Sequence, residues 1–237
     1  MNSLDEFLAA SAALHHHLCP RQVLGVRMGM LGGRLLGLAL PQNAARKRLL
    51  TIVETDGCFT DGIAVATGCR VGRRTLRVED FGKAAATFVD TDTGQAVRIA
   101  PSREARELAS EYAPEARHQW EAYLVGYWNM PERLLLSWQW VKLRSTVEAI
   151  VGEADRRTVC QACQEEIINQ REVIQGGCIL CRACAGQAYY TAAQPETKTT
   201  AGDSTRPEGH VMVRSGQVTG ITACTQEFSG DWRGSGL

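Results

Sequence analysis

Apolar residues recur every three to four positions near the start of the chain. In Asn2–His15 this spacing predicts an amphipathic helix. A second helix is predicted over Pro20–Leu40, because proline is favoured at the first helical position. That segment contains five glycines, each of which weakens a helix by about 1 kcal/mol relative to alanine. So many glycines indicate a neighbouring element that larger side chains would push away.

Shorter apolar runs with the character of strands follow. Arg48–Glu54 predicts a buried strand. A short helix is expected over Asp61–Cys69, ended by Gly68. The polar segment Asp90–Gly94 predicts a turn between two strands. The further strands that the pattern predicts are Thr75–Asp80, Ala85–Asp90 and Gln95–Ala100.

Helices are predicted again after the strands, over Ser102–Tyr112, Pro114–Asn129 and Pro131–Arg144. Four tryptophans in this region are expected to pack in the core: Trp120, Trp128, Trp138 and Trp140. Strands and helices do not alternate regularly along the chain. This order favours an α+β fold, a mixed helix and sheet core, over a doubly wound sheet.

The composition changes twice towards the end of the chain. A cysteine-rich segment begins near Asp155, and a polar segment begins after Tyr190. We therefore expect three parts: a metal-binding core domain over residues 1–153, a zinc ribbon over 154–190, and a linker or disordered tail over 191–237. In the tail, a weak hairpin around Ser215-Gly216 would need another element to pack on.

Charge and composition argue against several classes of protein. Lys and Arg number 26, and Asp and Glu also number 26, so there is no net charge to attract nucleic acid or membrane. We expect no signal peptide, and no apolar run reaches the roughly 18 residues of a membrane helix. The cytoplasm is the expected compartment. Nine cysteines in a reducing compartment favour metal binding over disulfides.

The strongest chemical signal is a group of five cysteines in the predicted ribbon. Two CxxC pairs on facing loops place four thiolates around one zinc at about 2.3 Å. We prefer the set Cys160, Cys163, Cys181 and Cys184, because the nearby Gly186 lets the second loop bend its amides towards sulfur. Cys178 is then an alternative ligand, a spare thiol or a redox-active neighbour. An iron–sulfur cluster is the rival occupant.

A second candidate site lies in the segment "HHHLCP", residues 15–20. Helical side chains two positions apart diverge, whereas alternate side chains of an extended chain fall on one side. The residue before proline is pushed into extended geometry, so His15, His17 and Cys19 are able to face one metal ion. Cys58, after a predicted strand and Gly57, would complete a His/Cys site for zinc or iron. Alternatively, the histidines cap and pack the first helix.

Four motifs, in this order, give the chain a resemblance to a known family. "HHHLCPRQVLGVRMG", "ETDGCFTDGIAVATGC", "VGRRTLRVEDFGKAAATF" and "LCRACAGQAYY" resemble the FmdE family, which is named after the operon of formylmethanofuran dehydrogenase, over roughly residues 3–190. Arg21 stands where the family usually has glycine, and His16 where it often has a small residue.

The resemblance implies a core domain that is often dimeric and binds a metal through its His and Cys residues. It also implies a zinc ribbon at Cys160, Cys163, Cys181 and Cys184. Asp61 and Lys83 fall in family-like motifs. Asp61 would act as a proton acceptor or as a partner of a metal ligand, and Lys83 would hold an anionic substrate.

Three functions follow from these features. The first is a metal-binding protein whose core site acts on or holds a small anionic substrate or cofactor. The second is an accessory or metal-delivery subunit of a molybdenum or tungsten oxidoreductase. The third is a zinc-ribbon regulator that binds nucleic acid, which the neutral charge and the lack of a basic helix do not favour.

Overall fold

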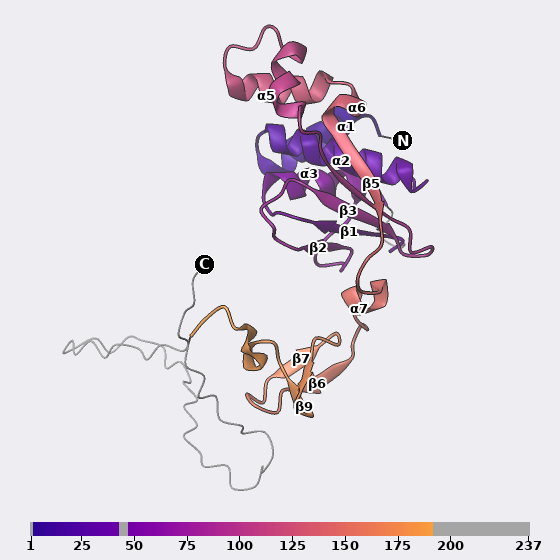
Figure 1. Ribbon diagram of the computed structural model, residues 1–237, viewed down its shortest axis with the longest axis vertical. Coiled ribbons are helices and arrows are strands. Elements are labelled where there is room, and N and C mark those ends of the chain that lie inside the picture. The colour runs from indigo at the N-terminus through magenta and orange to yellow at the C-terminus, as the bar shows by residue number, and fades with distance from the viewer. Residues whose placement is uncertain (1, 43–46, 192–237) are drawn as a thin grey trace, which may run out of the picture. The chain divides into compact units, whose positions relative to one another are not determined.

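The computed structural model describes residues 2–42 and 47–191 (Figure 1). The chain divides into two compact units, of which the first ends at Val151 and the second begins at Gly152. The predicted tail, with its hairpin around Ser215-Gly216, lies outside the described residues except for Thr191. No helix in the two described ranges is both long and apolar enough to cross a membrane.

The first unit begins with helices, continues with strands and returns to short helices. Its elements are α1 (Leu4–His15), α2 (Pro20–Leu35), β1 (Leu49–Val53), α3 (Cys58–Thr67), β2 (Leu76–Val78), β3 (Ala86–Asp90), β4 (Ala96–Pro101), α4 (Ala105–Leu108), η1 (Ala109–Tyr112), α5 (Gln119–Asn129), α6 (Glu132–Leu135), β5 (Leu136–Val141) and α7 (Val147–Val151).

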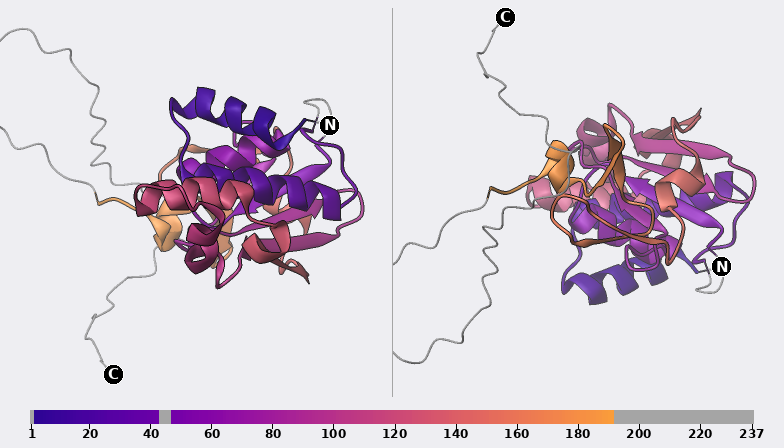
Figure 2. Two further views of the ribbon diagram at one scale, coloured as in Figure 1. Left: turned by 90° about the horizontal axis from the view of Figure 1, so that it is seen from above. Right: turned by 90° about the horizontal axis from the view of Figure 1, so that it is seen from below.

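The strands form one mixed sheet in the order β2-β1-β3-β4-β5. β1 and β2 are parallel, and the remaining neighbours are antiparallel. On one face α2 packs against β3 and β4, and both α1 and α3 pack against α2. Figure 2 shows α1 running alongside these helices. On the other face α7 packs against Leu50, Val89 and Ala96. The predicted α+β class is confirmed.

Glycines let α2 approach its neighbours closely. A Cβ atom on Gly25 would lie 2.1 Å from the carbonyl oxygen of Phe59 in α3. A Cβ atom on Gly32 would lie 2.5 Å from the ring of Phe88 in β3. Both distances are shorter than atoms tolerate, so the glycines in α2 are a packing requirement that outweighs their cost to the helix.

The second helix is shorter than its apolar pattern predicts, because it ends at Leu35 instead of Leu40. Gly37 adopts the left-handed conformation with φ of 65°. The N–H of Leu38 donates to the carbonyl of Gly33 at 2.8 Å, and the N–H of Gly37 donates to that of Arg34 at 3.1 Å. This is a Schellman motif, in which glycine ends a helix. Gly37 is therefore the stop signal of the helix and not part of its interior.

The predicted helix over Pro131–Arg144 is wrong for most of its length, because only α6 is helical and the chain continues as β5. The segment Leu-Ser-Trp-Gln-Trp-Val alternates with the period of a strand. It pairs with β4, so that Trp138 lies opposite Ile99 and Trp140 opposite Val97. Hydrogen bonds with β4 stabilise the strand, and a prediction from the local sequence cannot include them.

Core packing is also the wrong expectation for three of the tryptophans. The exposed fractions of Trp120, Trp138 and Trp140 are 50%, 47% and 52%. The rings of Trp138 and Trp140 meet edge to face, with centroids 5.9 Å apart. Because β5 is the last strand of the sheet, these rings have a covering neighbour on one side only. Of the four tryptophans, Trp128 alone packs against the core, and its indole N–H donates to Asp5 Oδ1 at 3.2 Å.

The described part of the second unit, residues 152–191, contains two small antiparallel hairpins and a helical turn. β6 (Arg157–Val159) pairs with β7 (Glu166–Ile168), and β8 (Val173–Gln175) pairs with β9 (Cys178–Leu180). The short element η2 (Ala183–Gln187) follows β9. Such short strands bury little apolar surface, so hairpins of this size need another source of stability.

Candidate metal centres

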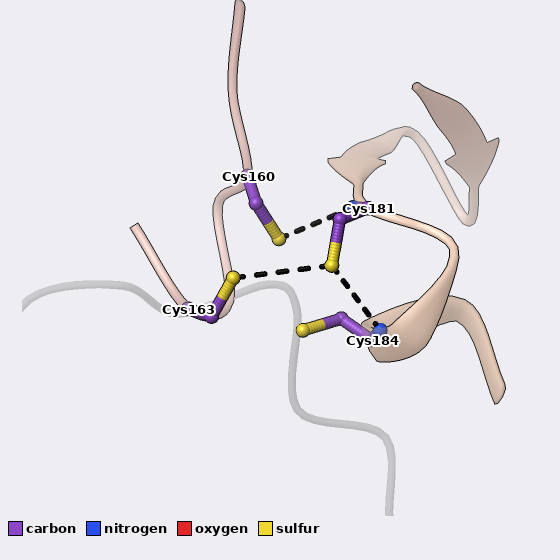
Figure 3. Close-up of side chains that lie close together, drawn as sticks. All are labelled: Cys160, Cys163, Cys181 and Cys184. Atoms are coloured by element: carbon purple, nitrogen blue, oxygen red, sulfur yellow. Dashed lines mark hydrogen bonds between the residues drawn. The ribbon is translucent and has the colours of Figure 1, made fainter. Parts of the chain in front are cut away.

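Four cysteine side chains converge in the second unit (Figure 3). Cys160 and Cys163 lie between β6 and β7, whereas Cys181 and Cys184 follow β9. Their sulfur atoms all lie within 4.8 Å of one another. A tetrahedral ion with bonds of about 2.3 Å holds its sulfurs about 3.8 Å apart, and the Sγ atoms of Cys163 and Cys181 are 3.9 Å apart. The spacing therefore suits one metal ion.

Left-handed backbone conformations turn both loops towards this centre. Gly186, after the second CxxC pair, has φ of 86°. Gln164, after the first pair, has φ of 65° without being a glycine. The N–H of Cys181 donates to Cys160 Sγ at 3.2 Å, and the N–H of Cys184 donates to Cys181 Sγ at 3.4 Å. Such amide contacts favour thiolate sulfur.

The pKa values of these thiols differ because each thiol has different hydrogen-bond partners. Burial opposes ionisation of Cys160, but hydrogen bonds from the backbone amides of Cys163, Cys181 and Ala162 outweigh it and lower its pKa to about 6. Burial raises the pKa of Cys163 and also that of Cys184, where hydrogen bonds with the other cysteines add to the effect. A cation is therefore required before all four sulfurs can be thiolates together.

Cys178 does not join this group, although it is close in sequence. Its side chain is buried at the start of β9, and its Sγ lies 4.0 Å from the carbonyl oxygen of Gly176. The four converging cysteines are the set preferred from the sequence. A single tetrahedral site is consequently complete without Cys178.

The predicted core site lies at the ends of three helices. His15 is the last residue of α1, Cys19 precedes the first residue of α2, and Cys58 is the first residue of α3. Cys58 Sγ lies 3.0 Å from His15 Nε2. Partial burial raises the pKa of Cys58, and a hydrogen bond with the Cys19 side chain raises it further. The ring centroids of His15 and His17 are 4.7 Å apart.

The backbone brings these groups together differently from the expectation. The segment from His15 to Cys19 is not extended throughout, because α1 continues to His15 and His16 is left-handed with φ of 64°. Extended geometry is present at Cys19, directly before the proline, with φ of −128° and ψ of 160°. A sharp turn at His16, and not an alternating strand, places the His15 and His17 rings on one side.

The two additional candidates occupy different positions. Asp61 is one turn after Cys58 in α3, and its Oδ2 lies 3.0 Å from His15 Nδ1. His15 thus faces a carboxylate with one ring nitrogen and a thiol with the other. The side chain of Lys83 is exposed, and its backbone N–H donates to the carbonyl of Glu54 at 3.1 Å, at the end of β1. Among the described residues, no contact joins the Lys83 ammonium to His15 or Cys58.

The core residues meet in pairs rather than as a closed cluster. Among residues 2–42 and 47–191, only the four ribbon cysteines form a group of three or more metal-binding side chains with all ligand atoms within 4.8 Å. Sequence reasoning also missed Gln22, which is fully buried beside Cys19. The signal was present in the sequence, since glutamine three residues after a helix-capping position is typical of a capping box.

Comparison with known proteins agrees with this architecture. The crystal structure of a tungsten formylmethanofuran dehydrogenase FmdE-like protein from Syntrophus aciditrophicus aligns with a TM-score of 0.50 and 21% identity, covering 80% of this chain and 96% of that one. At that identity the likeness concerns the fold alone.

A curated relative and a family model match the sequence itself. A "Probable S-adenosyl-L-methionine-binding protein" from Archaeoglobus fulgidus is 30% identical over an alignment of 208 residues, which covers 79% of this chain and 55% of that protein. The chain thus spans about half the length of this relative. Residues 14–137 match the family model "FmdE, Molybdenum formylmethanofuran dehydrogenase operon". Because this match includes more than half of the chain, the protein belongs to the FmdE family.

Proposed function

We propose that the first unit binds one metal ion through His15, His17, Cys19 and Cys58, and that this ion acts on or holds a small anionic substrate or cofactor. The observation that carries the proposal is the position of the His15 ring between Asp61 and Cys58, at 3.0 Å from each. Metal-binding histidines usually donate their second ring N–H to a carboxylate, which fixes the tautomer. Asp61 has this role in the proposal, and it leaves His15 Nε2 available for the metal.

The residues present fit a metal ion after a small adjustment. A shared ion at about 2.0 Å from nitrogen and about 2.3 Å from sulfur holds the two atoms about 3.5 Å apart. His15 Nε2 and Cys58 Sγ, now 3.0 Å apart, would therefore separate by roughly half an ångström. Imidazole and thiolate together suit zinc or iron.

Reactivity requires an open position, because four protein ligands close a tetrahedral site. His17 has an exposed side chain, in contrast to the buried Cys19, and is the ligand that a substrate would replace most readily. A bound ion with one open position polarises a carbonyl group or activates water. Lys83 lies on a loop whose backbone is bonded to Glu54, four residues before Cys58, and would attract an anionic group.

In the second unit we propose zinc as the bound metal. The support is the set of four cysteines with the sulfur spacing of a tetrahedral site and the amide contacts to two of the sulfurs. Zinc with four thiolates is a closed, structural arrangement. The ribbon would thus stabilise its own fold and leave the chemistry to the first unit.

Metal analysis tests the core site directly. We expect two metal ions per chain in the unaltered protein and one in Cys58→Ser or Cys19→Ser, measured by elemental analysis after gel filtration. His17→Ala should weaken retention without abolishing it, because two thiolates and His15 remain. Cys69→Ser is the matched control, because Cys69 is a buried thiol beyond the opposite end of α3 from Cys58, where it accepts a hydrogen bond from Thr51 of β1.

Circular dichroism checks that each variant is folded before its metal content is compared. Unchanged metal content in Cys58→Ser would reject the core metal site. Loss of metal in Cys69→Ser would show that any cysteine replacement has the same effect, and it would also remove the support for the assignment.

Two alternatives have support of their own. Family membership supports an accessory or metal-delivery role for a molybdenum or tungsten oxidoreductase, which co-purification of such an enzyme with the tagged chain would favour. The name of the Archaeoglobus relative supports binding of S-adenosylmethionine. Calorimetric titration of the metal-loaded chain with S-adenosylmethionine tests this second ligand. Absence of heat at millimolar ligand would count against S-adenosylmethionine binding by the part of the relative that this chain matches.

We also propose that the protein is a homodimer that pairs through β5. This strand is the last in the sheet, and its six residues contain no charge and no proline, which are the usual devices that protect an open edge. An uncharged strand can pair with its own copy without repulsion. Trp138 and Trp140 would then cover apolar surface that is half exposed in the single chain.

Light scattering coupled to gel filtration should give twice the mass of the chain for the unaltered protein. Trp138→Lys should shift it to monomer at micromolar concentration, because a pair of ammonium groups would meet near the two-fold axis. Trp120→Lys is the control, since Trp120 is exposed to a similar extent but lies on α5. A monomeric unaltered protein, or equal dissociation of both variants, would contradict the proposal.

A further inference from the structure

The buried side-chain amide of Gln22 lies beside the core site and forms hydrogen bonds at both of its ends. Gln22 lies in the first turn of α2 and is 0% exposed. Its Oε1 accepts a hydrogen bond from the N–H of Cys19 at 2.7 Å. Its Nε2 donates to the carbonyl oxygen and to the hydroxyl of Ser11, both at 3.0 Å. A buried amide is costly unless it is bonded, and both ends of this one are bonded.

These contacts close the loop that carries the predicted ligands. Ser11 is one helical turn before His15 in α1, and Cys19 is the last residue before α2. The Gln22 side chain therefore binds the backbone before this segment, at Ser11, and at its end, at Cys19. His17, which lies between them, is exposed and turns with the left-handed His16. The Gln22 side chain thus bridges the two ends of this loop.

The backbone of the same residue holds the third element of the site. A Cβ atom on Gly62 would lie 2.4 Å from the carbonyl oxygen of Gln22, so that α3 packs directly on the backbone of this residue. Gly62 lies next to Asp61, the partner of His15. Gln22 is thus in contact with each of the three segments that supply the predicted ligands.

We infer that Gln22 is a positioning residue for the core metal site. Its amide orients Cys19 by accepting the N–H of that residue, and it holds the end of α1 so that the His15 imidazole meets the Cys58 thiol, which in turn contacts Cys19. The inference rests on the proposed core site. It predicts that removing the amide lowers the affinity of the core site for metal by more than a loss of folding stability would explain.

The test compares Gln22→Met with Ser11→Ala in the full-length chain. Methionine has a similar length but neither the acceptor for the Cys19 N–H nor the donor to Ser11. Ser11→Ala removes only the hydroxyl contact of the same amide and leaves its hydrogen bond with Cys19 intact. Zinc affinity is measured by chelator competition, with the core component defined as the one absent from Cys58→Ser. Cobalt substitution provides a second readout, because the intensity and position of its absorption bands report the ligand geometry.

For Gln22→Met we expect a loss of core affinity of at least about tenfold, which is typical when a residue that orients metal ligands is removed. The cobalt spectrum of the core component should also change. Ser11→Ala should lower the melting temperature but keep the core affinity within about threefold of the unaltered protein, because the bond that orients the Cys19 ligand remains. Affinity of Gln22→Met within that same range, or an equal loss in Ser11→Ala, would overturn the inference.

A further variant keeps the test decisive if Gln22→Met does not fold. Gln22→Glu has the same shape and retains an acceptor for the Cys19 N–H, but it loses the donor to both oxygens of Ser11 and so releases the end of α1. The cobalt spectrum of the core component should therefore change, and an unchanged spectrum would overturn the inference. The result is separable from the proposed function itself. An unaltered chain without any Cys58-dependent metal rejects the core site, whereas a metal that is present and insensitive to Gln22 rejects only the positioning role.

Discussion

Replacing Cys163 by serine is expected to abolish metal binding in the ribbon and to unfold it, while the first unit remains folded. Among the described residues of the second unit, only Cys160, Ile167 and Cys178 are buried. A core of that size cannot offset the entropy of ordering the hairpins. Structural zinc contributes about 10–16 kcal/mol of apparent free energy in small zinc-dependent folds, so folding and binding should be one event here.

Hydrogen exchange followed by mass spectrometry measures this effect for each unit separately. Peptides from β6 to β9 should lose all protection in Cys163→Ser, whereas peptides from α2 and β3 should keep theirs. Cys69→Ser should leave both sets unchanged. Acidification should act in the same direction as the substitution, because thiols with a raised pKa, such as Cys163 and Cys184, must lose protons to bind metal. Retained protection in Cys163→Ser would show that the hairpins fold without the metal.

Introducing a single methyl group at Gly25 is expected to be among the most destabilising changes in the first unit. Its Cβ would lie 2.1 Å from the carbonyl oxygen of Phe59 and 3.0 Å from the backbone nitrogen of Ile63. Both atoms belong to the backbone of α3, which cannot rotate away as a side chain can. The two helices must therefore separate, and we expect Gly25→Ala to lose about 3 kcal/mol or more of unfolding free energy.

Urea denaturation of the full-length chain measures this loss. Gly72→Ala is the control, because a Cβ there meets nothing within 4 Å. It should leave the midpoint almost unchanged, whereas Gly25→Ala should shift it strongly. The same separation would draw Cys58 away from Cys19, so retention of the proposed core metal should fall as well. An equal midpoint for the two variants would show that α2 and α3 have more freedom than their packing indicates.

Many elements of the first unit were predictable because their signals are local. Helix α3 ends where Gly68 takes the left-handed conformation, and the turn over Asp90–Gly94 joins β3 to β4 as its composition indicates. The proline at the first position of α2 also has its expected place. In each case the residue that ends or begins the element acts through its own backbone, so no distant neighbour is needed to predict it.

Strand β5 and the surface tryptophans were not predictable in this way. The segment that contains Trp138 and Trp140 has both a helical and an alternating interpretation. Its pairing with β4, about forty positions away in sequence, decided between them. The exposure of the two rings follows from the place of β5 at the rim of the sheet. Neither the strand order nor the rim is encoded in a short window of residues.

Of the two candidate metal centres, one follows from local sequence spacing and the other depends on tertiary packing. The spacing of the CxxC pairs predicted the group of four cysteines from the sequence alone, because each pair lies on one tight loop and two such loops suffice for four sulfurs. The core site depends on α1, α2 and α3 meeting at one end. Only the tertiary structure decided that His15 lies between Cys58 and Asp61, and that Gln22 closes the loop beside them. These contacts depend on how distant segments pack, as in the close approach of α2 and α3 at Gly25 and Gly62.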